Sequence, residues 1–330
     1  MESIISVCEV FKTFRQPKRF PGLGGAVRSI FIRDFTEVRA VSGISFDIAA
    51  GEAVGYLGPN GAGKSTMIKM MTGILVPTSG TLTVLGRTPH QDRMINAGEI
   101  GVVFGQRSQL WWDLPVSDSF SLHRRIYDIP DARYAENLSY LRAMLAMGSY
   151  LDRPVRQLSL GQRMRAEIAM ALLHDPKVLF LDEPTIGLDV VAKDAVRKFL
   201  SEVNRERGTT IVLTTHDLQD IEEICPRLIM VDDGKLLFDG ELPRLRESLG
   251  SRRRLTLEFA SDPGAVALST ARLVRDEGAL KHFLLDREDT SILDVLTELG
   301  SGYDLKDVAL HEPAIEEVIR TFYQQKPVLA

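Results

Sequence analysis

The stretch GPNGAGKST, residues 58–66, constrains this chain more than any other, because it places three glycines ahead of a lysine and two hydroxyls. Clustered glycine indicates backbone that must approach a ligand closely. The stretch fits G-x-x-x-x-G-K-[ST], a loop whose N–H groups surround phosphates. The run AVGYLG before it predicts a buried strand, and TMIKMMTGIL after it predicts a helix with Met67, Met70, Met71 and Ile74 on one face. A strand, this loop and a helix together predict a polyphosphate site.

The lysine and the hydroxyls of this stretch have defined roles toward a bound nucleotide. Lys64 is expected to reach the terminal phosphates, and the Ser65 hydroxyl is expected to ligate Mg²⁺. An ordinary glycine turn before a helix is the alternative, which the flanking strand and helix disfavour. The residues predicted to bind the nucleotide are Gly58, Pro59, Asn60, Gly61, Ala62, Gly63, Lys64, Ser65 and Thr66.

A second buried strand, VLFLDEPT, ends on two acidic residues, Asp182 and Glu183. An acid at this place is costly to bury without a partner. We therefore expect Asp182 to hold the Mg²⁺ shell and Glu183, next along the strand, to polarise an attacking water as a general base. Capping of the following helix is the alternative, and it is disfavoured because both halves of the site occur in one chain in the expected order.

A third pattern, LSLGQ at residues 158–162, precedes a helix between the two halves of the site. Ser159 is predicted to cap that helix, whose N-terminal N–H groups attract an anion. By itself this pattern predicts only a capped helix. The apolar side of the helix is predicted to consist of Met164, Ile168, Ala171 and Leu172.

Composition excludes several classes of protein. The formal net charge of −5 indicates no basic surface, so no nucleic-acid partner is expected. Two cysteines, Cys8 and Cys225, provide neither a disulfide framework nor paired metal ligands, and they are compatible with a reducing cytoplasm. No apolar run approaches the roughly 18 residues that span a bilayer. The start MESIISVCEVFK does not have the pattern of a signal peptide. Any role at a membrane is therefore expected to require partners.

The order of elements predicts an α/β fold with two domains. Strands alternate with helices along most of the chain, which is typical of a largely parallel sheet. Helices at 107–157 predict a separate helical lobe, and prolines and glycines at 15–37 interrupt the strand pattern as an insertion. A Gly, Ser and Arg cluster at 246–255 ends the first domain. Residues 251–330 predict a small α+β domain without a catalytic motif.

Together these motifs resemble those of the ATP-binding subunits of ABC transporters, over about residues 1–245. By this resemblance GPNGAGKST is the Walker A loop, LSLGQ the signature, LFLDE the Walker B strand and IGLD the D-loop. The resemblance also identifies Gln106 as the Q-loop glutamine near Mg²⁺ and the attacking water. His216, in LTTHDL, is the switch histidine that contacts the γ-phosphate. Leu160 departs from the usual signature glycine, and Ile-Gly replaces the usual Ser-Ala before Asp189.

The resemblance implies a P-loop NTPase fold: a RecA-like core with a mainly parallel sheet, an antiparallel β subdomain and a helical lobe in an ATP-binding domain at 1–245. A C-terminal accessory domain follows at 251–330. Two such subunits, identical or paralogous, close head to tail over two ATP molecules with Mg²⁺. By the resemblance the catalytic residues are Glu183, His216 and Gln106, the metal ligands are Ser65, Gln106 and Asp182, and further nucleotide contacts are Ser159, Gly161, Gln162 and Asp189. Either Phe14 or Phe35 stacks on adenine.

A narrower resemblance concerns the ATPases of ABC-2-type exporters. It rests on the insertion at 15–37, on QRSQLWWDLP, on EPTIGLD and on the terminal LHEPAIEEVIRTF. It implies ATP hydrolysis coupled to export through separate membrane permease subunits, at the cytoplasmic face of the membrane. The alternative is a soluble ABC ATPase of translation or DNA repair, which one cassette without sustained heptads fits poorly. Of the adjacent Trp111 and Trp112, at least one is expected to be exposed, because neighbours in an extended segment point to opposite sides.

Overall fold

The computed structural model describes residues 3–17, 35–105, 107–248, 253–285, 291–311 and 315–325. Gln106 and most of the insertion predicted at 15–37 lie outside these residues. The chain divides into two compact units, the first running from Met1 to Gly240 and the second from Glu241 to Pro327. Each unit has its own buried core.

A six-stranded sheet forms the centre of the first unit, in the order β5-β6-β7-β3-β8-β9. The pairs β5–β6, β6–β7, β7–β3 and β3–β8 are parallel, which confirms the predicted mainly parallel sheet. Every residue of β3 and β7 is buried, as is typical of a parallel sheet covered on both faces. The strands are β3 (Ala53–Leu57), β5 (Ile100–Phe104), β6 (Val178–Asp182), β7 (Thr210–Thr214), β8 (Arg227–Asp232) and β9 (Lys235–Glu241).

The carboxyl ends of these parallel strands meet at one edge of the sheet. Asp182, the last residue of β6, is paired with Phe104 of β5 on one side and with Thr214 of β7 on the other. The segments that follow the three strands therefore begin side by side, although they are far apart in the sequence. This edge is where open α/β sheets place their ligands.

A three-stranded antiparallel sheet, in the order β2-β1-β4, forms the second layer of this unit. Its strands are β1 (Ser3–Pro17), β2 (Phe35–Ala49) and β4 (Ser79–Val84). The β1–β2 pairing continues to Pro17 and Phe35, so it extends into both ends of the segment 15–37. Apolar side chains from this sheet, from β3 and from α2 share one core, in which the Phe46 and Tyr56 rings lie 5.9 Å apart.

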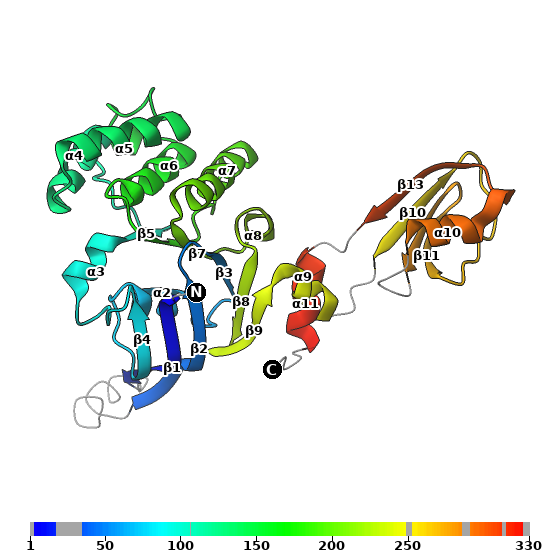
Figure 1. The fold of residues 1–330 in the computed structure, drawn as a ribbon, viewed down its shortest axis with the longest axis horizontal. Coiled ribbons are helices and arrows are strands. Elements are labelled where there is room, and N and C mark those ends of the chain that lie inside the picture. Colours follow the sequence, from blue (N-terminus) through cyan, green and yellow to red (C-terminus); the bar gives the residue numbers. More distant parts are fainter. Residues whose placement is uncertain are drawn as a thin grey trace, which may run out of the picture. The chain divides into compact units, whose positions relative to one another are not determined.

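Helices surround the central sheet, and α4, α5 and α6 gather at the end of the unit away from β1, β2 and β4 (Figure 1). In the part of the chain that is described, no helix is both long and apolar enough to cross a bilayer. The helices of this unit are α2 (Lys64–Met71), α3 (Arg93–Glu99), α4 (Val116–Ile126), α5 (Asp131–Met144), the 3₁₀ turn η1 (Val155–Gln157), α6 (Leu160–Leu172), α7 (Val190–Arg207) and α8 (Leu218–Ile224).

Helix α2 is shorter than the sequence pattern predicts. Met67, Met70 and Met71 are buried, but Ile74 lies beyond the last residue of α2 and is 53% exposed, so the prediction that it shares one helical face with them is wrong. The helix ends because Gly73 adopts a left-handed φ of 78°, and its N–H donates to the Met70 carbonyl at 3.0 Å. A side chain at position 73 would also collide with the backbone at Pro89.

The second unit is built on an antiparallel sheet in the order β11-β12-β10-β13, with α10 supplying Val295 and Leu299 to its core. Strand β11 was not predicted, because it is an edge strand in which only Ala271 is buried and no alternation shows. The elements are α9 (Leu242–Ser248), β10 (Arg254–Phe259), β11 (Ala271–Glu277), β12 (Leu280–Leu285), α10 (Ile292–Leu299), the turn η2 (Gly300–Gly302), β13 (Leu305–His311) and α11 (Ile315–Gln325).

The separate core of the second unit predicts that it can be weakened alone. Phe283 is fully buried in that core, so Phe283→Ala should destabilise the unit by about 3–5 kcal/mol. Hydrogen–deuterium exchange of the full chain should show lost protection in β10 and β12 and unchanged protection in β7. Leu273→Ala, on the exposed edge strand, is the matched control and should change neither. Equal loss of protection in β7 would contradict independent cores.

Candidate functional site

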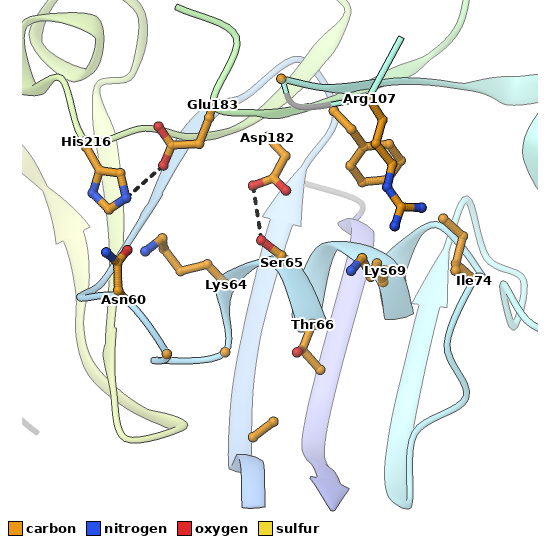
Figure 2. Close-up of a pocket in the computed structure, with 15 residues that line it drawn as sticks. Asn60, Lys64, Ser65, Thr66, Lys69, Ile74, Arg107, Asp182, Glu183 and His216 are labelled. Atoms are coloured by element: carbon orange, nitrogen blue, oxygen red, sulfur yellow. Dashed lines mark hydrogen bonds and ion pairs between the residues drawn. The ribbon is translucent and has the colours of Figure 1, made fainter. Parts of the chain in front are cut away.

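A cavity of about 520 Å³ opens at the carboxyl edge of the central sheet (Figure 2). The glycine loop and the start of α2 form one wall, and the ends of β5 and β6 with the segment after β7 form the other. The structure thus brings together two parts of the site that lie more than a hundred residues apart in the sequence. The predicted site residues that line the cavity are Asn60, Gly61, Gly63, Lys64, Ser65, Thr66, Asp182, Glu183 and His216.

Two glycines let the loop approach the neighbouring strands closely. Gly63 has a φ of 98°, and a Cβ there would lie 2.2 Å from the Ala40 carbonyl oxygen of β2. A Cβ on Gly58 would lie 2.5 Å from the Val231 carbonyl oxygen of β8. Both contacts are too short for any side chain, so only glycine permits this path of the loop.

Lys64, the first residue of α2, holds its ammonium group inside the loop. Its Nζ donates to the Gly58 carbonyl at 2.6 Å and to the Pro59 carbonyl at 3.2 Å, and the residue is 8% exposed. Burial lowers the pKa of the Lys64 ammonium, and the carboxylates of Glu183 and Asp182 act in the opposite direction. A cation that has lost part of its hydration is stabilised by an anionic ligand, so Lys64 fits a phosphate group.

Asp182 lies at the centre of a cluster of oxygen atoms. Its Oδ1 accepts a hydrogen bond from Thr214 Oγ1 at 2.6 Å and one from Ser65 Oγ at 3.4 Å. Within the described ranges, no group of three or more His, Cys, Asp or Glu side chains could hold a metal alone. A carboxylate and a hydroxyl fit Mg²⁺, which usually takes one or two protein ligands and completes its shell with phosphates and waters.

Glu183 does not continue the strand as predicted, because it turns out of β6. Its backbone adopts a left-handed φ of 60°, which is uncommon for a non-glycine residue, while its N–H donates to the Thr214 carbonyl at 2.9 Å. This turn directs the carboxylate toward His216, whose Nε2 lies 3.1 Å from Glu183 Oε1 (Figure 2). Burial raises the pKa of Glu183, and the charges of His216 and Lys64 oppose this effect.

The predicted Q-loop glutamine, Gln106, lies outside the described residues, but its preceding neighbour can be placed. The N–H of Gly105 donates to the Asp182 carbonyl at 2.7 Å. A Cβ on Gly105 would lie 2.4 Å from the carbonyl oxygen of Glu183. The backbone that leads into position 106 therefore lies directly against the two acidic residues.

Sequence reasoning missed several residues that line the cavity. Lys69 follows Ser65 by one helical turn, so its place on the same face of α2 could have been found from the spacing. Arg107 and Ile74 lie at the other end of the cavity from His216 (Figure 2). Neither aromatic candidate, Phe14 nor Phe35, lines the cavity, although both are described. The unpredicted lining residues are Ala40, Lys69, Ile74, Phe104, Gly105 and Arg107.

The signature and D-loop residues form a second surface. Ser159 caps α6 as predicted, since its hydroxyl accepts from Gln162 N–H at 3.2 Å, and Gln162 Oε1 accepts from Ser159 N–H at 3.1 Å. Asp189 caps α7 by accepting from Ala192 N–H at 2.8 Å. A Cβ on Gly161 would lie 3.1 Å from Ala192 Cβ, so the two helix starts are adjacent. Ser159, Gly161, Gln162 and Asp189 are all described, and none of them lines the cavity.

Comparison with known proteins identifies the family. The ABC transporter family matches residues 41–186. The Nod factor export ATP-binding protein I of Ralstonia nicotianae is 35% identical over 88% of this chain and 95% of its own length. The methionine import ATP-binding protein MetN 2 of Bacillus licheniformis is 32% identical over 90% of this chain and 83% of its own.

A solved structure agrees with these relatives. The dimeric ATP-binding cassette MJ0796, in a post-hydrolysis state bound to ADP and Pi, aligns with a TM-score of 0.60 and 25% identity, covering 72% of this chain and 98% of that one. The family match over residues 41–186 includes both the glycine loop and the acidic strand, whose residues converge on the cavity. The chain therefore belongs to the ATP-binding proteins of ABC transporters, and it is a P-loop ATPase that binds and hydrolyses ATP.

Proposed function

We propose that this chain is the ATP-hydrolysing subunit of an ABC-2-type exporter, acting at the cytoplasmic face of a membrane on separate permease subunits. In this proposal it closes head to tail with a second copy, or with a paralogous subunit, over two Mg-ATP. The division of the motif residues between two surfaces carries the proposal. Lys64 and Glu183 line the cavity, whereas Ser159 and Gly161 lie outside it at the start of α6, where they can cover a nucleotide bound by another subunit.

Relatives supply the support for export. The chain aligns with a protein named for Nod factor export over nearly that protein's whole length. A relative named for methionine import is similar to a lesser degree, so the direction of transport needs its own test. The test is reconstitution with the membrane proteins encoded beside this chain, followed by a vesicle transport assay that measures the direction of transport.

The proposal also assigns the two parts of the chain. Residues 1–245 are the ATP-binding domain, and residues 251–330 are an accessory domain.

The proposed mechanism relies on position and charge rather than on a covalent step. The glycine loop and Lys64 would bind the phosphates, and Ser65, Gln106 and Asp182 would hold Mg²⁺. When bound, Mg²⁺ neutralises charge on the phosphate oxygens. Glu183 accepts a proton from the attacking water. His216, whose Nε2 lies 3.1 Å from that carboxylate, orients it and would contact the γ-phosphate of bound ATP.

Replacing Glu183 tests both the base and the dimer. Glu183→Gln keeps the shape of the side chain but removes the base, so turnover should fall by about 10²–10⁴-fold while ATP still binds. Because hydrolysis is what separates the two subunits, the variant should elute as a dimer on size exclusion with Mg-ATP. The same variant without nucleotide is the control and should elute as a monomer. Turnover equal to that of the parent, or a monomer with Mg-ATP, would contradict the proposal.

The pH dependence of hydrolysis follows from the environment of Glu183. Only the ionised carboxylate is a base, and burial raises its pKa. As the pH is lowered, activity should therefore be half lost at a pH above about 4.3, the pKa of a free glutamate. His216 opposes that rise, so His216→Ala should move the acid limb to still higher pH. The measurement is kcat/KM for Mg-ATP against pH, because this ratio reports the pKa of the base in the free enzyme. Loss of activity with a midpoint at the pKa of a free glutamate would contradict this assignment. A midpoint that His216→Ala moves to lower pH would also contradict it.

Two exposed tryptophans provide a candidate surface for the permease. Trp111 and Trp112 are each 54% exposed, which confirms that at least one is exposed. Their backbone holds the segment in place, since Trp111 N–H donates to Ser119 Oγ at 3.2 Å and the Trp112 carbonyl accepts from Arg156 N–H at 3.0 Å. Of the two rings, that of Trp112 also lies against the guanidinium of Arg163 in α6, 6.0 Å from the ring centre. Exposed tryptophan is a common anchor of protein interfaces.

Removing these rings should separate docking from hydrolysis. We expect that at least one of Trp111→Ala and Trp112→Ala weakens capture of the permease in a pull-down by about thirtyfold, which corresponds to the loss of about 2 kcal/mol expected for an anchor residue. ATP hydrolysis and the melting temperature of the isolated subunit should stay near the parent values. Val274→Ala, at a half-exposed apolar position of the second unit, is the matched control. Normal capture by both tryptophan variants would show that this surface does not dock.

A further inference from the structure

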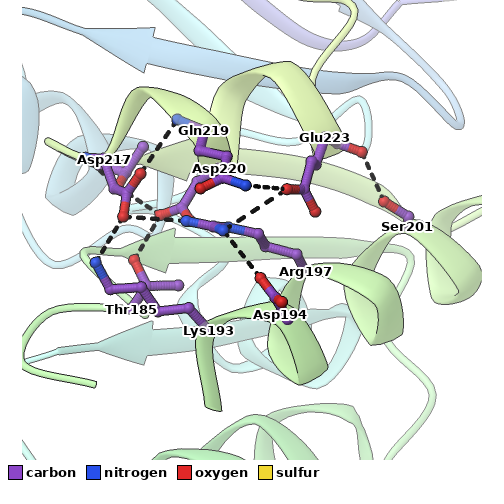
Figure 3. A network of polar contacts seen from close by, with 10 residues as sticks. Thr185, Lys193, Asp194, Arg197, Ser201, Asp217, Gln219, Asp220 and Glu223 are labelled. Atoms are coloured by element: carbon purple, nitrogen blue, oxygen red, sulfur yellow. Dashed lines mark hydrogen bonds and ion pairs between the residues drawn. The ribbon is translucent and has the colours of Figure 1, made fainter. Parts of the chain in front are cut away.

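A buried ion pair lies beneath the segments that carry Glu183 and His216. Arg197 of α7 and Asp220 of α8 are 1% and 0% exposed, and Arg197 Nε donates to Asp220 Oδ1 at 2.6 Å (Figure 3). Asp217, Asp194 and Glu223 lie within 3.0, 3.3 and 3.6 Å of the same guanidinium. Burying charges costs desolvation energy that their attraction often only balances. A contribution to folding stability therefore does not by itself explain why this ion pair is buried. The other hydrogen bonds of Asp220 suggest a second role.

The second oxygen of Asp220 connects two parts of the site. Its Oδ2 accepts hydrogen bonds from Thr215 Oγ1, at 2.7 Å, and from Thr185 Oγ1. Thr215 directly precedes His216, and Thr185 follows Glu183 by two residues. Both threonines are almost fully buried. One carboxylate oxygen thus ties together the two backbone segments from which Glu183 and His216 extend.

The segment after Glu183 needs such an anchor. A left-handed φ in a residue other than glycine persists only where the surrounding structure holds it. The turn that follows Glu183 has few backbone hydrogen bonds, with Ile186 N–H to the Glu183 carbonyl at 3.4 Å and Leu188 N–H to the Thr185 carbonyl at 3.2 Å. The Thr185 hydroxyl on Asp220 is the side-chain contact that fixes this turn against α8.

The segment that carries His216 is held from both sides. Thr215 Oγ1 accepts from Asp217 N–H at 3.0 Å while it donates to Asp220. Asp217 in turn binds Lys193 Nζ of α7 at 2.6 Å. The backbone on either side of His216 is therefore set by the same helices, α7 and α8, that hold Asp220.

We propose that Asp220, held by Arg197, is a positioning residue for ATP hydrolysis, which through Thr185 and Thr215 keeps Glu183 and His216 in contact. This inference rests on the roles of Glu183 and His216 in the proposed function. Asp220 acts only through other residues. Arg197, Asp220, Thr185 and Thr215 are all described and do not line the cavity, so ATP binding is not expected to depend on them directly.

Removing one hydroxyl at a time tests the proposal while the ion pair remains intact. In the full chain, Thr185→Val and Thr215→Val should each lower kcat about tenfold or more, because small misplacements of catalytic groups are costly. KM and the dissociation constant for a fluorescent ATP analogue should stay within about twofold of the parent, since the phosphate-binding loop is unchanged. Thr185→Ser and Thr215→Ser keep the hydroxyl and should recover most of the lost kcat.

Two further variants separate positioning from general stability. Ser201→Ala removes a hydroxyl that donates to the Glu223 carbonyl at 2.9 Å, at the edge of the same network, and should leave kcat unchanged (Figure 3). In a Glu183→Gln background Thr185→Val should have little further effect on kcat, because the base whose backbone segment Thr185 holds is already absent.

The outcomes distinguish this inference from the proposed function. If Glu183→Gln hydrolyses ATP like the parent, the proposed role of Glu183 fails. If Glu183→Gln is slow but Thr185→Val and Thr215→Val keep the parent kcat, the positioning role of Asp220 is wrong. The positioning role is also overturned if the valine variants lose melting temperature in step with kcat and the serine variants recover neither. A loss of kcat at unchanged ATP affinity and melting temperature, restored by serine, supports it.

Discussion

The hydrogen bond from Thr214 to Asp182 is the contact on which the site depends, because it fixes the ends of two neighbouring parallel strands in register. The next residue, Glu183, bonds through its N–H to the Thr214 carbonyl, and Gly105 bonds to the Asp182 carbonyl. The segments that follow β5, β6 and β7 therefore leave the sheet side by side, at the same end of the strands. The glycine loop approaches this end from β3, so Ser65 comes within reach of Asp182.

The charged residues near this end of the sheet form two groups, an upper layer that lines the cavity and a lower layer that is buried away from it. In the cavity, Lys64 and Glu183 are partly desolvated, and their pKa values shift toward the neutral forms, lower for the lysine and higher for the glutamate. Arg197 and Asp220, which do not line the cavity, form a pair that is almost fully shielded from solvent. The upper layer is suited to bind phosphate and to move a proton. The lower layer is suited to hold the backbone that carries it.

Local chemistry made the loop, the acidic strand and the Ser159 cap predictable, because each depends on residues close together in the sequence. The prediction for Ile74 was wrong because Gly73, in a left-handed conformation, ends α2 early. The backbone of Pro89 packs against Gly73, and this contact between separate segments cannot be read from the sequence of the helix. Strand β11 was missed because an exposed edge strand shows no apolar alternation. Arg107 and Ala40 were missed because only the packing of the sheets brings them to the cavity.

Residue types and their spacing along the chain already indicate the chemistry of this protein: a phosphate-binding loop, a carboxylate pair at the end of a buried strand and a capped helix, in an order typical of one family. Spacing and residue type were sufficient there, since backbone conformation and ligand preference are local properties. Two relations become visible only in the folded chain: Glu183 turns toward His216, and Ser159 and Asp189 lie outside the cavity. The folded chain also shows that Asp220 joins the two sides of the site. These relations depend on strand register and helix packing between distant segments, which no short stretch of sequence encodes.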